Sequence, residues 1–267
     1  MAHGLSSIDW QAPWLTPWRE RGEWIAEQVK QGASVEQACN ASLQLRRPQT
    51  ETLSQGHKAV CHVQFVPQAV LPDGQAYEQF IFNAQQVPTR DGLHDFFNAL
   101  CWLEFPLAKK QLNQLQATAI QAQGVGAVRG AVRDAVTVFD ENATLIQLPD
   151  ELWHALHVRD WHTAFVAMKP SWKDVHILIF GHAALEKLVN PYKAITVHLW
   201  RVPSGLPSSD WDSWLAQDLQ PEKLAVKPFL PTPVLGVPGW WPPNECADFY
   251  ADSQVFRPPR HSNSVQF

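Results

Sequence analysis

The amino-acid sequence predicts an α+β protein, a single compact domain with mixed or antiparallel strands, several helices and a long irregular C-terminal strap rich in Pro and Trp. Helical and strand periodicities both occur along the chain, no repeat or Gly/Ser-rich linker divides it, and apolar residues make up 45% of its 267 residues. A chain of this size can bury a substantial core. We expect one domain over residues 1–267, with a helical pair at 16–45, a core at 57–220 and the strap at 221–260.

The N-terminal region is predicted to form two helices. Thr16 and Pro17 are typical of a helix start, and Gly32 is typical of a helix end. Ser34 and Gln37 have the spacing of a capping box, which places the start of a second helix at this point.

The first part of the core is predicted to contain a hairpin and two helices. Apolar residues alternate over 59–65, and a turn at 72–74 precedes a second strand at 77–82. A helix capped by Asp91 should run to about residue 104. Pro106 interrupts it, and a further helix should cover about 107–121.

The second part of the core is predicted to alternate strands and helices. Apolar, β-branched runs at 135–139 and 144–148 indicate another hairpin, with residues 140–142 as its turn. The remaining elements are expected as a weak helix at 153–168, a strand at 175–180, a helix at 182–189, a strand at 195–200 and a helix at 210–219.

The sequence contains 13 Trp and 21 Pro, and most of the Trp residues lie beside Pro in irregular segments. Exposed Trp rings can stack on sugars or bases, but rings in such segments can also hold extended chain against a core through their buried area. We favour the second interpretation. The prolines after residue 227 prevent a helix, and exposed aromatic residues there would form a large apolar patch, so the strap should be buried against the fold.

Composition argues against several classes of partner and location. The net charge is −5 and no basic run is present, which does not suit nucleic-acid binding. No basic leader or apolar span is visible, so we expect a cytoplasmic protein that does not bind membranes. Cys39, Cys61, Cys101 and Cys246 are widely spaced, which predicts reduced thiols and no disulfide framework.

The segment 87–102 is the most informative for function. On a helix, Asp91, His94, Asp95 and Asn98 share one face, and this set of side chains suits a metal ion or a general acid–base pair. Arg90, just before them, can orient a carboxylate or phosphate. Alternatively, the two acids only complement the helix dipole. The other face is apolar and should meet the core; it carries Leu93, Phe96, Phe97, Leu100 and Leu103.

A second cluster has the residue types of a zinc site. His182 and Glu186 are four residues apart on a predicted helix, and His198 lies on the next predicted strand. A His/His/Glu set of this kind can hold a catalytic metal with an open position. The spacing is permissive, since His and Glu four residues apart are common on ordinary helices.

Arg133 and Asp134 directly precede an apolar run, which indicates a buried ion pair or an anion contact at Arg133. The acidic residues at 140–142 are expected to serve the turn. The glycines after residue 123 lack the dinucleotide-binding spacing, and no P-loop or nucleophile-elbow motif occurs.

Several of these stretches resemble a proteobacterial domain-of-unknown-function family, numbered three-zero-two-five, over about residues 65 to 260. The resemblance brings no activity with it. A fainter likeness is to HNH-type nucleases, because His94, Asn98 and Asn113 occur in a similar order, although a helix is predicted after His94. The stretches similar to the family are 77–81, 87–90, 93–100, 133–134, 139–142, 181–183, 185–188, 233–241, 244, 249–250 and 255–258.

The leading hypothesis is a metal-assisted hydrolase with a divalent ion such as zinc or magnesium. The rival is a non-catalytic adaptor that binds a partner protein through the polar helix face and the Trp/Pro-rich segments. Convergence of the 91–98 face and the 182–186 pair on one pocket would favour the enzyme. In the hydrolase, His94, Asp95, Asn98 and Arg90 would be catalytic, His182, Glu186 and His198 would bind metal, and Arg133 would contact an anionic substrate group.

Overall fold

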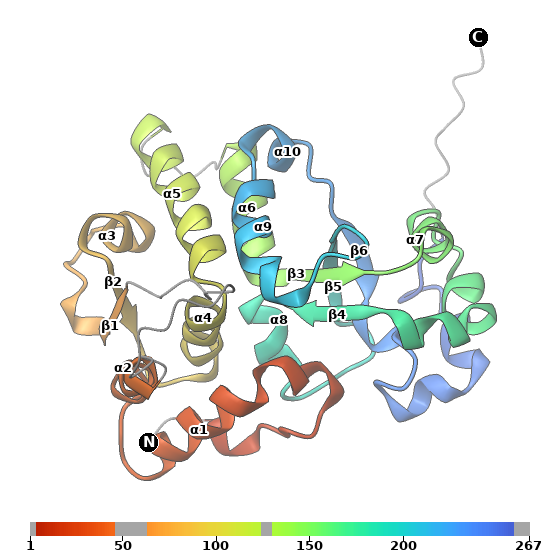
Figure 1. Ribbon diagram of the computed structural model, residues 1–267, viewed down its shortest axis with the longest axis horizontal. Helices are drawn as coiled ribbons and strands as arrows, with labels where there is room; N and C mark the ends of the chain where they lie inside the picture. Colours follow the sequence, from red (N-terminus) through yellow and green to blue (C-terminus); the bar gives the residue numbers. More distant parts are fainter. Residues whose placement is uncertain (1–3, 46–62, 124–129, 259–267) are drawn as a thin grey trace.

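The structure of the protein is a computed structural model that describes residues 4–45, 63–123 and 130–258. It has the α+β class that the sequence predicts, with helices around a four-stranded sheet and a separate two-stranded sheet (Figure 1). In this view the two-stranded sheet and α3 (Tyr77–Ala84) lie on one side of α4 (Leu93–Glu104), and the larger sheet lies on the other.

The four-stranded sheet has the order β4-β3-β5-β6 and mixes parallel and antiparallel pairs. The central strand β3 (Ala143–Gln147) is antiparallel to β4 (His176–Ile179) and parallel to β5 (Thr196–Arg201). The outer strand β6 (Leu230–Pro233) belongs to the C-terminal strap and pairs antiparallel with β5. Its prolines are compatible with an edge position, because an edge strand can lack ladder donors.

The two-stranded sheet corrects the first predicted hairpin. Strand β1 (Gln64–Pro67) pairs in parallel with β2 (Gln86–Thr89), and α3 lies in the connection between them. The strand predicted at 77–82 is therefore wrong. Its buried residues, Phe80 and Ile81, are sequence neighbours, which one face of a helix accommodates and one face of a strand does not. Most of the strand predicted at 59–65 falls outside the described residues.

The second predicted hairpin is also wrong, because residues 135–139 belong to helix α6 (Ala131–Asn142). The buried side chains Ala135, Val136 and Phe139 are one and four residues apart, which is a helical pattern. Residues 140–142 form the last turn of the helix, and β3 follows directly. This arrangement turns Asp140 toward neighbouring helices.

Helices α4 and α5 (Pro106–Gln123) confirm the sequence prediction and form the centre of the molecule. Pro106 begins α5, where its missing N–H costs no helical hydrogen bond. Every residue of α4 from Asp95 to Leu103 is buried, which includes Asp95 and Asn98 of its polar face, whereas His94 is half-buried.

The N-terminal pair consists of α1 (Arg19–Lys30) and α2 (Val35–Leu45). The backbone N–H of Ser34 donates to Gln37 Oε1 at 3.1 Å, as the predicted capping box requires. Asp91 does not cap α4 as predicted. Its carboxylate accepts from the N–H of Val35 at 2.9 Å, and Asp91 therefore serves the start of α2.

The remaining helices agree with the sequence at two places. Helices α8 (His182–Lys187) and α9 (Trp211–Asp218) confirm the predicted elements, and α10 (Pro221–Ala225) follows. Helix α7 (Asp150–His157) is shorter than predicted, and a π-helical turn (Thr163–Ala167) and a 3-10 helix (Lys169–Asp174) continue the chain to β4. None of the helices in the described part of the chain combines the length and apolar character that a membrane span requires.

The strap packs against the fold, as predicted. Phe249, Tyr250 and Phe256 are buried, and the Tyr250 ring stacks on Phe165 at a centroid distance of 5.4 Å. The Tyr250 hydroxyl donates to the carbonyl of Gly236 at 3.0 Å. All 13 Trp side chains lie in the hydrophobic core or against it, which supports their structural interpretation.

Candidate functional site

A cavity of about 510 Å³ lies among α3, α4, α5, α6 and α8. Its size is within the range of small-molecule sites in proteins. Six of the eight predicted site residues line it, so the polar face of α4 and the start of α8 converge on one cavity. These six are Arg90, His94, Asp95, Asn98, Arg133 and His182.

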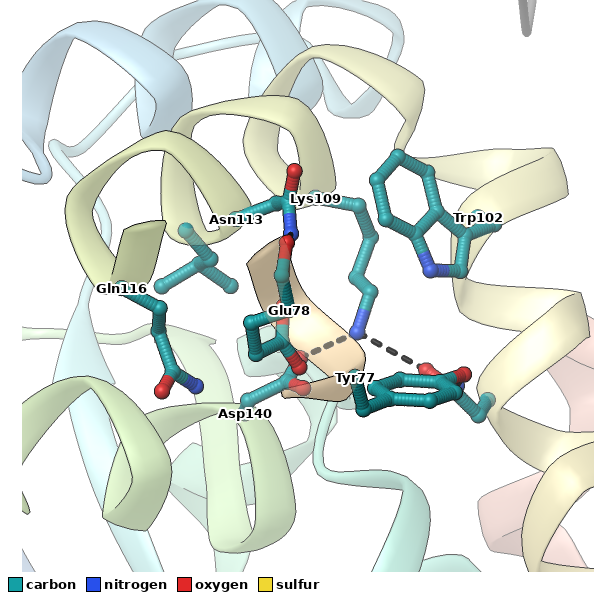
Figure 2. A pocket seen from close by; sticks show the side chains of 9 residues that line it. Tyr77, Glu78, Trp102, Lys109, Asn113, Gln116 and Asp140 are labelled. Carbon is teal, nitrogen blue, oxygen red and sulfur yellow. Dashed lines mark hydrogen bonds and ion pairs between the residues drawn. The ribbon is translucent and has the colours of Figure 1, made fainter. Parts of the chain in front are cut away.

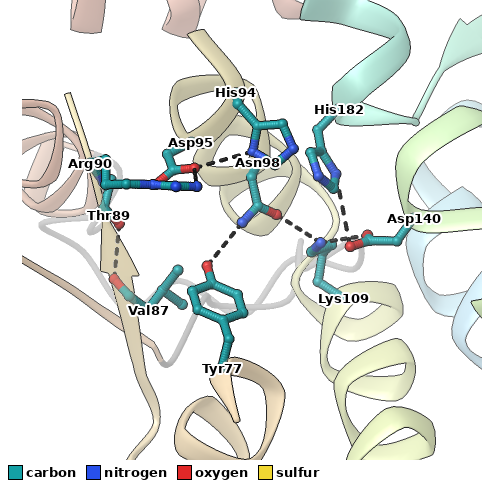
Figure 3. A network of polar contacts seen from close by, with 10 residues as sticks. All are labelled: Tyr77, Val87, Thr89, Arg90, His94, Asp95, Asn98, Lys109, Asp140 and His182. Carbon is teal, nitrogen blue, oxygen red and sulfur yellow. Dashed lines mark hydrogen bonds and ion pairs between the residues drawn. The ribbon is translucent and has the colours of Figure 1, made fainter. Parts of the chain in front are cut away.

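Asp95 fixes the position of two neighbouring side chains (Figure 3). It accepts hydrogen bonds from Arg90 Nε and Nη2, each at 2.9 Å, and from the Arg90 backbone N–H at 2.7 Å. His94 Nδ1 lies 3.1 Å from Asp95 Oδ1. Burial alone would raise the pKa of Asp95, but the hydrogen bonds from His94 and Arg90 lower it well below its usual range. Asp95 is therefore a carboxylate that orients His94.

His94 and His182 face each other at the cavity, with ring centroids 4.6 Å apart and ring planes at 89°. The hydrogen bond with Asp95 raises the pKa of His94. Burial lowers the pKa of His182 to about 4, so this ring is uncharged at neutral pH. Two adjacent titratable groups with pKa values shifted in opposite directions are typical of an acid–base site.

A chain of polar contacts lies beneath the histidines (Figure 3). The buried Lys109 Nζ donates to Asn98 Oδ1 at 2.9 Å and to Asp140 Oδ1 at 2.5 Å. Asn98 Nδ2 donates to the hydroxyl of Tyr77 at 3.2 Å, and His182 Nδ1 lies 3.8 Å from Asp140 Oδ2. Burial would raise the pKa of Asp140, but the charge of Lys109 lowers it. Lys109 thus keeps Asp140 as a carboxylate close to His182.

Glu78 occupies the boundary between the main cavity and a smaller void of about 10 Å³ (Figure 2), which has room for about one water molecule. Asn113 Nδ2 donates to Glu78 Oε2 at 2.7 Å and to its carbonyl at 2.8 Å. Burial raises the pKa of Glu78. The side chain is therefore a carboxyl group whose protonated form is favoured relative to that of an exposed glutamate.

Gly181 brings α8 close enough to α6 for His182 to approach Asp140. A Cβ atom at this position would lie 2.5 Å from the carbonyl oxygen of Glu141 and from the backbone of Asn142. The N–H of Gly181 also donates to the carbonyl of Ala143 at 2.8 Å. The absence of a side chain at residue 181 is therefore part of the site's geometry.

The other predicted residues occupy different positions. Arg133 lines the cavity, and its buried Nε has no hydrogen-bond partner. Glu186 does not line it, although its charge raises the pKa values of His94 and Arg90. His198 lies on β5 with its ring 5.7 Å from that of Phe229, away from the cavity lining.

The predicted zinc set of His182, Glu186 and His198 is not assembled. Over residues 4–45, 63–123 and 130–258, no three His, Cys, Asp or Glu side chains form a group that could hold a metal ion. The HNH order does not give a nuclease finger either, since His94 lies in the first turn of α4 and no strand follows it there.

Sequence reasoning missed Tyr77, Glu78 and Lys109 as site residues, considered Asn113 only in the HNH-like order, and assigned Asp140 to a turn. One signal was available for α5: Lys109, Asn113 and Gln116 recur at helical spacing and could have indicated a polar face. All three are buried. No comparable signal marked Tyr77 and Glu78, because their segment was assigned to a strand.

The fold and the cavity define an α+β protein with a polar pocket of ligand size. The chain belongs to a family described as a protein of unknown function (DUF3025), whose model matches residues 63–260. The whole cavity lining falls within this range. No curated protein and no solved structure matches the chain. The family has no assigned function, so the function is inferred from the site.

Proposed function

We propose that the protein is a hydrolase that acts on a small polar molecule in the cavity by general acid–base catalysis. The observation that carries the proposal is His94, oriented by Asp95 and set edge-to-face against His182 at the cavity lining. A base held by a carboxylate is the arrangement that proton transfer to and from a substrate requires.

The roles of the two histidines follow from their surroundings. A carboxylate is only an acceptor, so Nδ1 of His94 carries a proton and Nε2 is the nitrogen that gains and loses one. In the proposed reaction a water molecule gives a proton to His94 and its oxygen bonds to the electrophilic atom of the substrate. The same proton then passes to the leaving group as the scissile bond breaks. His182, uncharged, accepts a hydrogen bond from that water.

The proposal keeps the hydrolase that the sequence predicts but rests on the His94–Asp95 pair and needs no metal ligand. It also favours the enzyme over the adaptor. In the strap between residues 228 and 258, Phe249, Tyr250 and Phe256 are buried. Phe229, Trp240 and Trp241 are partly buried against the core, so this segment leaves a partner little aromatic surface.

Hydrolysis of chromogenic substrates tests the proposal. The panel consists of p-nitrophenyl acetate, p-nitrophenyl phosphate, bis(p-nitrophenyl) phosphate, p-nitrophenyl glycosides and amino-acid p-nitroanilides. We expect His94→Gln to lower kcat/KM by about 100-fold or more on the best substrate, because a positioned general base contributes on that scale. His176→Gln, which removes an exposed histidine on β4, is the matched control and should leave the rate unchanged.

The form of the pH profile provides a second readout. Asp95→Asn removes the carboxylate that raises the pKa of His94. The rate should rise with pH as the general base loses its proton, so this ascending limb of the profile should shift to lower pH. Turnover that survives in His94→Gln, or that falls equally in His176→Gln, would refute the assignment, as would absence of turnover on the whole panel.

We also propose that the chain acts as one domain in the cytoplasm. The thiol of Cys101 is buried and donates to the carbonyl of Phe180 at 3.0 Å, which suits a reduced structural cysteine. Cys61 lies outside the described residues. Fractionation of cells that express the tagged chain would test the location.

A further inference from the structure

We propose that Arg133 binds a carboxylate or phosphate group of the substrate, at the end of the cavity away from the two histidines. The inference deepens the proposed function, because it assumes that the cavity is the substrate site. It assigns the substrate to small organic molecules that carry an oxyanion at one end and a hydrolysable bond at the other.

Arg133 differs from the other cations of the site. Among the described residues, Arg90 is paired with Asp95 and Lys109 with Asp140, whereas Arg133 forms no ion pair. Its Nε is also buried without a hydrogen-bond partner while the residue lines the cavity. Arg133 as a whole is half-buried, but a buried donor atom without a partner is costly, so a ligand oxygen that reaches Nε from the cavity would be favoured.

Glu78 is the nearby acidic residue that could compensate Arg133, since the positive charge of Arg133 acts on its carboxyl group. The two side chains form no ion pair, and Glu78 Oε2 instead accepts from Asn113. Burial of Glu78 also favours its protonated form. The charge of Arg133 therefore remains available to a ligand.

The charged side chains of α6 are distributed unevenly along the cavity wall. Arg133 lies near its first turn, whereas Asp140 and Glu141 lie near its end, and all three line the cavity. An anionic group would be attracted to the Arg133 end and repelled by Glu141 at the other end, where Lys109 balances the charge of Asp140. This asymmetry orients the ligand with its oxyanion away from His182, which lies beside Asp140.

The same helix sets the length of the ligand. Arg133 and Asp140 are seven residues apart, which corresponds to about 10 Å along an α-helix. A molecule that reaches from Arg133 to the histidine pair therefore has roughly the length of a phosphorylated sugar or a dipeptide. The cavity of about 510 Å³ accommodates a molecule of this size.

Binding of simple anions tests the inference without any turnover. Isothermal titration calorimetry with inorganic phosphate and with glutarate should show binding to the wild-type protein, and the tighter of the two identifies the oxyanion. Arg133→Gln should weaken the tighter probe at least about 10-fold, because a charge-assisted contact is lost. Arg133→Lys should have an intermediate effect. Arg257→Gln, which removes an exposed cation of the strap, should have none.

Several results would overturn the inference. One is that Arg133→Gln binds both probes as tightly as the wild type. Another is that neither probe binds the wild-type protein up to about 10 mM. Equal weakening by Arg257→Gln would show a non-specific charge effect. The histidines make the test independent of the proposed hydrolysis: His94→Gln should bind the anion normally. Loss of hydrolysis in His94→Gln with unchanged anion binding in Arg133→Gln refutes only the oxyanion site. Unchanged hydrolysis in His94→Gln with weakened anion binding in Arg133→Gln refutes only the hydrolase.

Discussion

The strap and the cavity wall both contain buried polar atoms, but the two regions differ in how many of these atoms form hydrogen bonds. In the strap, Tyr250 donates to Gly236, and Asn244 Nδ2 donates to the carbonyls of Leu235 and Val237, which leaves only its amide oxygen without a partner. In the cavity, Arg133 Nε and His182 Nδ1 form no hydrogen bond, and the nearest carboxylate oxygen to His182 Nδ1, that of Asp140, is 3.8 Å away. Polar groups directed at the backbone stabilise a fold, whereas unsatisfied ones around a cavity indicate a place for a ligand.

Removal of the strap should have the largest effect and tests whether it is structural. A chain that ends at Lys227 loses β6 and the buried rings of Phe249, Tyr250 and Phe256. We expect insoluble protein or loss of cooperative thermal unfolding, because the core that faces the strap would be exposed to water. Cooperative unfolding at an unchanged temperature would mean that residues 1–227 fold alone, and the single-domain proposal would fail.

Helix α4 carries core residues on its apolar side and cavity residues on its polar side. Phe97 tests the apolar side. The ring is fully buried, so Phe97→Ala should lower the free energy of unfolding by about 3 to 5 kcal/mol. The matched control is Phe82→Ala on α3, whose side chain is exposed and should contribute less than about 1 kcal/mol. Urea denaturation measures both. Equal effects of the two substitutions would contradict the burial of this face.

The free energy of unfolding is expected to depend on pH through His182, which lines the cavity. Its pKa is about 4 in the folded protein and about 6.5 in an unfolded chain, so the unfolded state binds the proton first. Stability linked to His182 is therefore present above pH 6.5 and is lost as the pH falls toward 4. At about 1.4 kcal/mol per pH unit, the loss approaches about 3 kcal/mol.

Comparison of the wild type with His182→Gln isolates this effect, because the carboxylates that titrate at lower pH are common to both proteins. The stability of the wild type should fall more steeply than that of the variant between about pH 7 and pH 4.5. His176→Gln, at an exposed position, should follow the wild type. Parallel curves for wild type and His182→Gln would show that the ring is not held uncharged.

Gly181→Ala should disturb the cavity more than the strap. The added Cβ would lie 2.5 Å from the backbone of Asn142, so α8 must shift away from α6. We expect a loss of about 1 to 3 kcal/mol, as for other overpacked sites, together with a changed pKa of His182. Gly92→Ala is the control, because its backbone is extended and no atom lies within 4 Å of its Cβ position. Thermal unfolding and NMR titration of the histidine would measure the two effects.

The sequence predicted α4 and α5 because long helical patterns with Pro and acidic boundaries leave little ambiguity. It failed at 77–82 and 135–139, because a short apolar run fits either a strand or a buried helix. The site residues also differ in how well the sequence could predict them. His94, Asp95 and Asn98 are close through local helical geometry, whereas Lys109 and Asp140 meet across 31 residues through the packing of helices. That packing depended on α6, which the sequence assigned to a strand.

The smallest expected effect concerns Glu78, and it bears directly on Arg133. A raised pKa means that stability linked to Glu78 is present below the pKa of the unfolded carboxyl, about 4.3, and is lost as the pH rises through the folded value. Glu78→Gln removes this loss and preserves an acceptor for Asn113. At about pH 8 the variant should therefore be at least as stable as the wild type. Glu20→Gln, at an exposed position on α1, is the control. If urea denaturation instead shows Glu78→Gln to be clearly less stable at this pH, Glu78 is ionised and compensates Arg133, and the cation would no longer be available to a substrate.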